Sequence, residues 1–336
     1  MINLDSETPL LIAEIGGNHQ GSLSKAKELM ISARESGADI VKFQSYSGEG
    51  LVNKKLRSDR FEHFNSFMLK DNEWIELAEF AQSNQIPFSS SIWETHYLDL
   101  LDKYICLYKV GSGDLNNFEL LEKFVSTKKP LIISTAMANI EMLRTVYDFL
   151  LAVSPSIVQD KRLGILQCTA IYDDPIPEHV SLRAMDLISK EFPCIVGFSN
   201  HAIGIHTSIA AIARGAKIIE FHFTFDKDND SFRDHRLSFN SKDLLEIKSF
   251  CEKFPKILGN NEKIITPKES SNTQEFRRGV FFANQIKKGD IIKKEDLTFL
   301  RPEIGISMWD DYKSIIGKKA KKDIEELEPL DFNFFE

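Results

Sequence analysis

The stretch that decides the fold reads IVGFSNHAIG (195–204), then an apolar helix-like segment, then KIIEFHFT (217–224). Its pattern is strand, loop, helix, strand, with His201 just past the first strand and His222 near the end of the second. In a barrel of parallel strands such ends meet at one mouth, where active sites lie. A single histidine is more often a structural residue than a ligand. Two at successive strand ends, with Glu220 on the same strand face as His222, favour a divalent metal site.

Eight apolar runs alternate with amphipathic segments over the first 255 residues. Nearly continuous apolar character is typical of parallel strands that are covered on their outer face. Eight strand–helix repeats predict an α/β fold, a (β/α)8 TIM barrel. The alternative is an open doubly wound sheet, but no G-x-G-x-x-G opens the first helix. The runs are residues 10–15, 39–44, 86–91, 104–110, 130–135, 163–169, 194–199 and 216–224.

The residue composition and the length of the apolar runs change after the barrel. We expect a barrel domain at residues 1–255, a polar linker at 256–275 and a small β-rich domain at 276–336. A domain of about sixty residues is below the size that folds comfortably alone, so we expect it to pack on another surface, such as a second subunit. Within the barrel, residues 45–72 form a longer insertion after the second strand. This insertion is a candidate active-site flap.

Composition excludes several classes of protein. The 42 basic and 50 acidic residues give a net charge of −8, which disfavours a general nucleic-acid binder. No apolar run approaches the length of a membrane span, and no basic segment precedes an apolar core at the N-terminus. The four cysteines lie far apart without CxxC spacing, which predicts free thiols in a reducing compartment. We therefore expect a cytoplasmic protein with no nucleic-acid or membrane partner.

Two lysines in strand-like runs are the most informative charged residues. Lys42 shares a strand face with Gln44, and Lys109 precedes Ser112 in KVGSGD. A lysine inside an apolar strand is costly without an anionic partner. Two such lysines ringed by hydroxyl groups indicate a phosphate or carboxylate ligand, with structural coincidence as the alternative. The hydroxyl residues at the other strand ends are Ser89, Ser90, Ser91, Ser134 and Thr135.

Polar side chains also follow the first, sixth and eighth strands. Carboxylates at these positions could bind sugar hydroxyls. The alternatives are a glycine-rich turn with a polar tip after the first strand and a surface acidic loop after the eighth. The residues are Glu14, Asn18, His19, Tyr172, Asp174, Arg233, Asp234 and His235.

The chain contains, in order, the motifs AEIGGNHQG, GADIVKFQSY, YKVGSGDL, PLIISTAMA, LQCTAIY, FSNHAIG and EFHFT. Together they resemble the sialic acid synthase family, which makes nine-carbon α-keto sugar acids, the nonulosonic acids. The tail from FRRGVFF to RPEIGIS is similar to that family's antifreeze-like (SAF) domain. The resemblance implies a transferase that condenses phosphoenolpyruvate with an N-acylated hexosamine. It also implies Mn2+ or Mg2+ and a domain-swapped homodimer.

The same resemblance implies roles for individual residues. His201 and His222 would hold the metal, and Glu14 is our candidate for moving a proton. Arg301 would reach in from the other subunit, and Tyr172 and Asp234, with Glu14, would face the sugar. The residues implied to bind phosphoenolpyruvate are Lys42, Ser90, Lys109, Ser112, Ser134 and Ser199.

The sequence departs from the family pattern in several places. Ala170 stands where the family usually has Asn or Ser, Asn200 where it has Asp, and Phe221 where it has Lys. The FRDHRLS loop (232–238) resembles legionaminic acid synthases more than N-acetylneuraminate synthases. The sugar expected is therefore 2,4-diacetamido-2,4,6-trideoxymannose, giving N,N'-diacetyllegionaminate, with N-acetylneuraminate or pseudaminate synthesis as alternatives.

Two other functions remain open at this point. A metal-dependent barrel hydrolase or lyase would also use His201 and His222, but it gives no reason for Lys42 and Lys109. A catalytically inactive sugar-binding paralogue is suggested by Ala170 and Asn200. Loss of turnover with retained sugar binding would indicate the latter.

Overall fold

The computed structural model describes residues 2–172, 177–228 and 232–336. The chain divides into two compact units, Met1–Gly259 and Asn260–Glu336. No helix among the described residues is long and apolar enough to cross a membrane.

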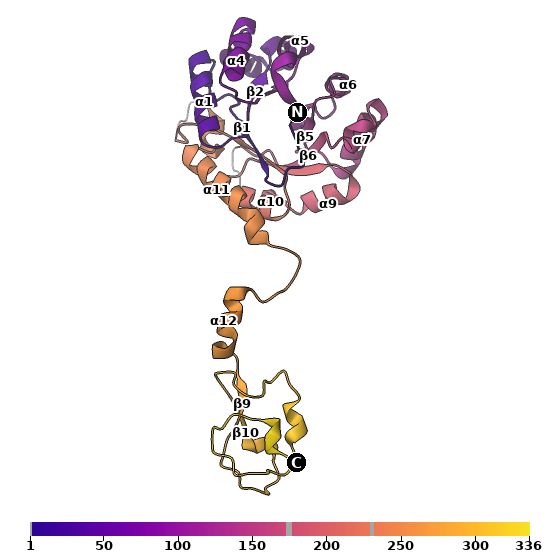
Figure 1. The fold of residues 1–336 in the computed structure, drawn as a ribbon. Coiled ribbons are helices and arrows are strands. Elements are labelled where there is room, and N and C mark those ends of the chain that lie inside the picture. The colour runs from indigo at the N-terminus through magenta and orange to yellow at the C-terminus, as the bar shows by residue number, and fades with distance from the viewer. Residues whose placement is uncertain (1, 173–176, 229–231) are drawn as a thin grey trace. The chain divides into compact units, whose positions relative to one another are not determined.

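The first unit is a closed barrel of eight parallel strands in sequence order (Figure 1). This confirms the predicted (β/α)8 fold, and each strand lies in one of the eight predicted apolar runs or within a residue of it. The strands are β1 (Leu10–Glu14), β2 (Ile40–Ser45), β3 (Phe88–Ile92), β4 (Ile105–Val110), β5 (Leu131–Ser134), β6 (Leu163–Cys168), β7 (Ile195–Asn200) and β8 (Ile218–His222).

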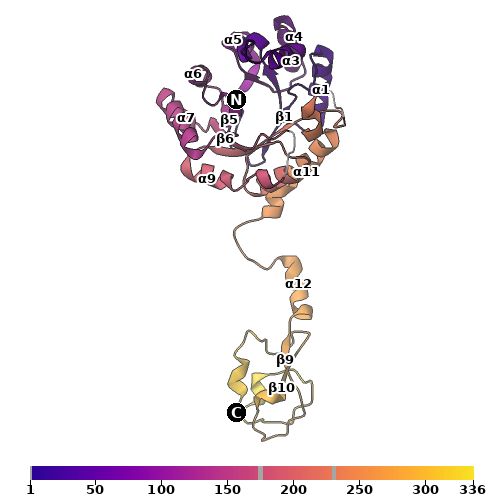
Figure 2. The same cartoon turned by 180° about the vertical axis from the view of Figure 1, so that it is seen from behind.

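Helices surround the strands on the outside of the barrel, as the two opposite views show (Figures 1 and 2). The first begins after Ser22, whose hydroxyl accepts a hydrogen bond from the Lys25 N–H, and the chain leaves it at Gly37, with φ +108°. The helices are α1 (Leu23–Glu35), α4 (Asp71–Ser83), α5 (Thr95–Leu101), α6 (Phe118–Ser126), α7 (Ile140–Val153), α8 (Ser156–Gln159), α9 (Ala184–Glu191), α10 (His206–Ala213) and α11 (Ser241–Leu258).

The inward-facing residues of the strands form layers. The layer nearer the amino ends of the strands is apolar, and Leu4 packs against it. This layer contains Ile12, Ile40, Leu107, Ile132, Leu166 and Ile218. Because side chains alternate along a strand, the next inward positions carry the polar groups. Glu14 is paired in register with Lys42 on one side and with His222 on the other. The barrel therefore brings the charged residues of several strands to one end.

The insertion predicted at residues 45–72 contains two short helices, α2 (Gly48–Leu51) and α3 (Ser58–Phe67). Short 3₁₀ helices occur elsewhere in the chain. They are η1 (Asp102–Tyr104), η2 (Ser112–Asp114), η3 (Pro177–His179), η4 (Arg233–Leu237), η5 (Lys294–Asp296), η6 (Tyr312–Ile315) and η7 (Phe332–Phe334).

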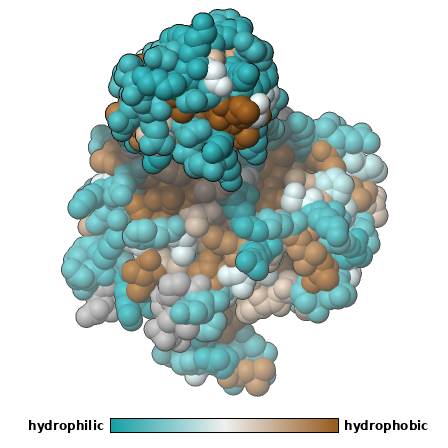
Figure 3. All heavy atoms as spheres, turned by 90° about the horizontal axis from the view of Figure 1, so that it is seen from below, coloured by the Kyte–Doolittle hydropathy of each residue, from teal (hydrophilic) through white to brown (hydrophobic). Residues whose placement is uncertain are grey.

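The second unit contains helix α12 (Pro267–Phe276) and an antiparallel pair of strands, β9 (Gly279–Phe282) and β10 (Leu297–Leu300). It has its own small core, built from residues that include Val280, Phe282 and Leu330. The segment expected as a linker thus holds most of α12 and the last turn of α11. The molecular face in Figure 3 is mostly hydrophilic with separate apolar patches.

Candidate active site

A cavity of about 800 Å³ lies at the carboxyl ends of the barrel strands. Every strand of the barrel contributes to its lining, directly or through the loop that follows it, as expected for an active site in this fold. The strand residues that line it include Glu14, Lys42, Gln44, Ser91, Lys109, Ser134, Cys168, Ser199, Glu220 and His222.

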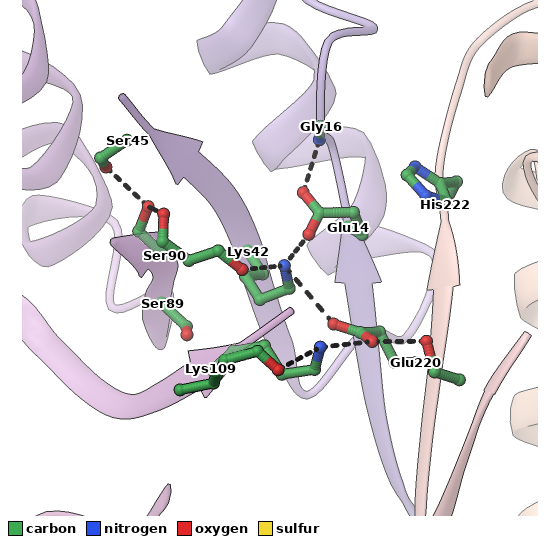
Figure 4. A network of polar contacts seen from close by, with 12 residues as sticks. Glu14, Gly16, Lys42, Ser45, Ser89, Ser90, Lys109, Glu220 and His222 are labelled. Carbon is green, nitrogen blue, oxygen red and sulfur yellow. Dashed lines mark hydrogen bonds and ion pairs between the residues drawn. The ribbon is translucent and has the colours of Figure 1, made fainter. Parts of the chain in front are cut away.

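Two lysines and two glutamates form a charged floor in this cavity (Figure 4). We call Glu14, Lys42, Lys109 and Glu220 the lysine–carboxylate floor. The Lys42 ammonium contacts the Glu14 carboxylate and lies 3.4 Å from Glu220 Oε1. Lys109 Nζ lies 3.3 Å from Glu220 Oε2. All four residues are at most 5% exposed, so each charge is compensated within the site.

Burial and neighbouring charges act in opposite directions on these groups. Burial lowers the pKa of Lys42 to about 7, although Glu220 opposes this change. Burial raises the pKa of Glu220, but Lys109 and Lys42 outweigh it and hold the pKa well below its usual value. Glu14 Oε1 also accepts a hydrogen bond from the Gly16 N–H at 2.6 Å. Glu220 is therefore a fixed negative charge between two cations.

The two histidines lie together in the same cavity. Their ring centroids are 5.4 Å apart. His201 Nε2 lies 3.1 Å from the Tyr172 hydroxyl, and His222 Nδ1 lies 3.6 Å from Asp234 Oδ2. Burial lowers the pKa of both histidines to about 3, helped by His222 in the case of His201 and by Lys42 in the case of His222. Both imidazoles are therefore neutral at pH 7, the state that coordinates metals.

The predicted hydroxyl groups divide into two sets. Ser112, Ser134 and Ser199 line the cavity. The Ser199 hydroxyl donates to Glu220 at 2.7 Å, and Ser112 Oγ accepts from the Ala136 N–H at 2.9 Å. Among the described residues, the Ser134 hydroxyl is buried without a hydrogen-bond partner. It is thus free to bind a ligand.

The structure corrects the predicted position of Ser90. It lies inside β3, not after it, and its register partner is the outward-facing Phe43. Its hydroxyl hydrogen-bonds the Ser45 hydroxyl at 2.6 Å, away from the cavity (Figure 4). Ser91 occupies the inward position and accepts from Lys42 Nζ at 3.0 Å. The Ser90 hydroxyl thus lies away from the cavity that its predicted anion-binding role requires, and Ser91 is the serine of β3 that lines the cavity.

Tyr172 and Asp234 both line the cavity beside the histidines. The Arg233 guanidinium lies over the Tyr172 ring, 4.1 Å from its centroid. Burial raises the pKa of Asp234, with Arg233 opposing the rise. Arg301 belongs to the second unit, in the loop after β10. Asp174, also proposed from the sequence, lies outside the described residues.

Comparison with known proteins decides the family. Residues 29–263 match the NeuB family and residues 277–336 match the SAF domain. The chain belongs to the NeuB family. An uncharacterised protein of Methanocaldococcus jannaschii is 36% identical and is aligned over 95% of this chain and 92% of its own.

Other NeuB-family relatives carry functional names. The N,N'-diacetyllegionaminic acid synthase of Campylobacter jejuni is 33% identical over 95% of this chain and 98% of its own. A solved N-acetylneuraminic acid synthetase from Leptospira borgpetersenii is similar with a TM-score of 0.71 and 25% identity, covering 80% of this chain and 91% of its own. Further relatives are named as N-acetylneuraminate-9-phosphate synthases and pseudaminic acid synthases. The relatives are thus sugar acid synthases of several specificities.

The departures from the NeuB pattern do not have equal consequences. Ala170 lines the cavity and offers no side-chain hydrogen bond there. Asn200 Oδ1 instead accepts from the Ala202 N–H and the Thr207 hydroxyl, both at 3.0 Å, so its side chain holds the turn before α10. The Phe221 ring stacks on Phe239, with centroids 4.5 Å apart. The changes at positions 170 and 221 both place an apolar side chain in the lining of the cavity, whereas Asn200 keeps a polar one there.

Sequence reasoning missed an aromatic part of this NeuB-family cavity. Tyr46, Phe64 and Trp93 all line it, and none was singled out as a site residue. Tyr46 and Phe64 come from the insertion that was predicted to be a flap, and Trp93 follows β3. Aromatic residues in such segments look like ordinary core residues, so the only signals were the position of Tyr46 and Trp93 just after strands and that of Phe64 in the insertion.

Proposed function

We propose that this chain is a nonulosonic acid synthase that condenses phosphoenolpyruvate with an N-acylated hexosamine and releases phosphate. The observation that carries the proposal is the presence of two buried ammonium groups, Lys42 and Lys109, in the same cavity as two neutral imidazoles. A hydrolase would use the histidines alone, whereas a substrate with a phosphate and a carboxylate gives both lysines a role.

The reaction forms one carbon–carbon bond. The enol electrons of phosphoenolpyruvate join its C3 to the aldehyde carbon of the open-chain sugar, and the aldehyde oxygen takes up a proton. Water then adds to the cationic C2 and loses a proton, giving a tetrahedral intermediate. The C2 hydroxyl of this intermediate then gives its proton to the departing phosphate as the bond between C2 and the phosphate oxygen breaks, which leaves a ketone at C2 and free phosphate.

The residues of the floor supply binding and proton transfer. Lys42 and Lys109 hold the phosphate and carboxylate, with the hydroxyls of Ser112, Ser134 and Ser199 beside them. Glu14 contacts Lys42 at the cavity side of β1 and is the candidate that moves a proton at the sugar aldehyde oxygen. Holding both reactants in one buried cavity supplies much of the rate through positioning.

His201 and His222 fit a divalent metal as nitrogen ligands. Both are neutral, and His222 Nδ1 is buried without a hydrogen-bond partner among the described residues. No group of three or more His, Cys, Asp or Glu is arranged for metal binding in the described part of the chain. We propose Mn2+ or Mg2+, which accept water and substrate oxygens as the other ligands. When bound, the cation polarises the sugar carbonyl.

For the sugar we propose 2,4-diacetamido-2,4,6-trideoxymannose, which would give N,N'-diacetyllegionaminate. A relative that is 33% identical carries the corresponding synthase name, and the FRDHRLS loop supports the same choice. Tyr172 and Asp234 would contact this sugar beside the histidines. The alternatives are N-acetylmannosamine and the pseudaminate precursor.

The test is a turnover assay with phosphoenolpyruvate, Mn2+ and a panel of N-acyl hexosamines. We expect phosphate release that requires both a sugar and phosphoenolpyruvate, and a product whose mass equals the sum of the sugar and pyruvate. Protein that binds phosphoenolpyruvate but releases no phosphate with any sugar would indicate an inactive paralogue. Protein that never binds it would favour the hydrolase.

We also propose a homodimer in which Arg301 completes the partner's site. Exposed apolar side chains flank Arg301 along the chain, among them Ile304 and Trp309, the latter 80% exposed. Such residues fit a surface that packs against another chain. We expect Arg301→Ala to lower kcat at least tenfold while the dimer persists in sedimentation. Full activity of a barrel fragment cut after residue 259 would contradict this role.

A further inference from the structure

Three aromatic rings form one wall of the cavity, and the chemistry proposed above uses none of them. We call Tyr46, Phe64 and Trp93 the aromatic wall. The rings of Tyr46 and Trp93 are stacked, with centroids 5.0 Å apart and planes inclined by 28°. Phe64 meets Tyr46 edge-on at 5.1 Å. The rings therefore form a mainly apolar surface in a cavity whose floor is charged. Its polar atoms are the Tyr46 hydroxyl and Trp93 Nε1, and Trp93 Nε1 is buried without a hydrogen-bond partner among the described residues.

Polar contacts fix this wall in place. The Ser47 hydroxyl donates to the Glu94 carboxylate at 3.1 Å, which ties the residue after Tyr46 to the residue after Trp93. The Gly48 N–H donates to Asn65 Oδ1 at 2.9 Å, next to Phe64. Each ring thus has a chain neighbour that takes part in these bonds. The rings hold their arrangement before any ligand binds, which reduces the entropy lost on binding.

The composition of the wall selects the chemistry of its ligand. Phosphoenolpyruvate is small and highly charged, so the lysines attract it and the rings do not. The sugar is the other reactant, and its apolar parts are acyl methyl groups and any deoxy carbon. Ring faces bind methyl groups well, whereas a hydroxyl against them would lose hydrogen bonds to water. Arg60 lies over the Phe64 ring at 5.3 Å, so part of that ring is already covered by a cation.

We propose that the aromatic wall is a subsite for the apolar substituents of the acceptor sugar, its acetamido methyl and 6-deoxy methyl groups. The wall gives the enzyme its preference for a diacetamido-trideoxy sugar over a sugar with a free 6-hydroxyl. The inference rests on the proposed function and deepens it by assigning the sugar selectivity to three residues.

The test compares kcat/KM for 2,4-diacetamido-2,4,6-trideoxymannose and N-acetylmannosamine in the full-length protein and its Phe64→Ala variant. One methyl group in an apolar pocket is worth about tenfold or more in discrimination. We therefore expect the wild-type preference for the trideoxy sugar to fall about tenfold in the variant. The affinity for phosphoenolpyruvate, measured by calorimetry, should change less than twofold.

The matched control is Phe67→Ala, on the same helix. Phe67 contacts Phe232 at 5.0 Å and does not line the cavity. It should leave the sugar preference unchanged. An unchanged preference in Phe64→Ala, an equal loss in both variants, or a wild-type preference for N-acetylmannosamine or its 6-phosphate would overturn the aromatic wall as a selectivity device. Absence of phosphate release with every sugar would instead overturn the proposed function, so the two failures are distinct.

Discussion

The lysine–carboxylate floor and the aromatic wall face the same cavity but are built in different ways. The floor residues sit on strands, where backbone register decides which atoms meet: Glu14 is opposite both Lys42 and His222. The wall residues sit at the ends of strands and on the insertion, held by side-chain bonds to Glu94 and Asn65. The difference suggests that the floor fixes the reaction, which a family shares, and that the wall fixes the sugar, which varies among relatives.

The largest effect should come from the two histidines at the ends of β7 and β8. Replacing His222 with Ala removes one of two proposed metal ligands, and we expect kcat to fall by about a hundredfold or more. Mn2+ binding, measured by calorimetry, should be lost while the melting temperature stays close to that of the wild type. The control is His96→Ala, because His96 is exposed and pairs with Asp71. Retained Mn2+ binding would remove His222 from the proposed ligands.

Removing Lys109 should have the next largest effect. Lys109→Ala leaves Glu220 with one cation fewer in a buried site and removes a positive charge from the proposed anion site. Removing one partner of a buried charge pair between protein and ligand costs about 3 kcal/mol of binding free energy. We therefore expect the affinity for phosphoenolpyruvate to fall roughly a hundredfold. Calorimetric titration with phosphoenolpyruvate measures this affinity in both proteins.

The control for that experiment is Lys123→Ala. Lys123 is more than one-third exposed and pairs with Glu119 on the outer helix α6. Its loss should leave the affinity unchanged. Equal affinity in the wild type and Lys109→Ala would show that this lysine is only a structural partner of Glu220.

The floor also predicts a pH dependence. Burial lowers the pKa of Lys42 to about 7, so this lysine loses its charge as pH rises through that value. A neutral amine attracts an anion poorly. We therefore expect the affinity for phosphoenolpyruvate to be high at pH 6.5 and to fall about tenfold by pH 8.5.

Arginine at position 42 provides the comparison, because a guanidinium keeps its charge throughout this range. The Lys42→Arg variant should bind more weakly overall if its larger head fits poorly, but its affinity should be flat with pH. If the affinity of the wild type for phosphoenolpyruvate is also independent of pH, then Lys109 alone provides the positive charge that binds it.

The sequence predicted the barrel and most of the floor because both depend on strands. Apolar runs mark the strands, and a lysine or histidine inside such a run needs a partner that offsets the cost of burying its polar group. Ser90 was misplaced because three consecutive serines carry no alternation of apolar and polar residues, so their facing depends on the register with β2. The aromatic wall was missed because its rings meet through tertiary contacts between the insertion and the loop after β3, which no local sequence pattern marks.

The smallest effects distinguish the two faces of β3. Ser91→Ala removes a hydroxyl that accepts from Lys42 in the cavity, so we expect a two- to fivefold loss of phosphoenolpyruvate affinity and little change in stability. Ser90→Ala leaves the buried Ser45 hydroxyl without its partner, which should lower the free energy of unfolding by about 1 kcal/mol without changing affinity. Urea unfolding and calorimetry on both variants measure the two quantities. The two residues are adjacent and identical, so the opposite result can be recognised: Ser90→Ala would lower the affinity and Ser91→Ala the stability. That result would mean that Ser90, and not Ser91, faces the cavity beside the charged floor.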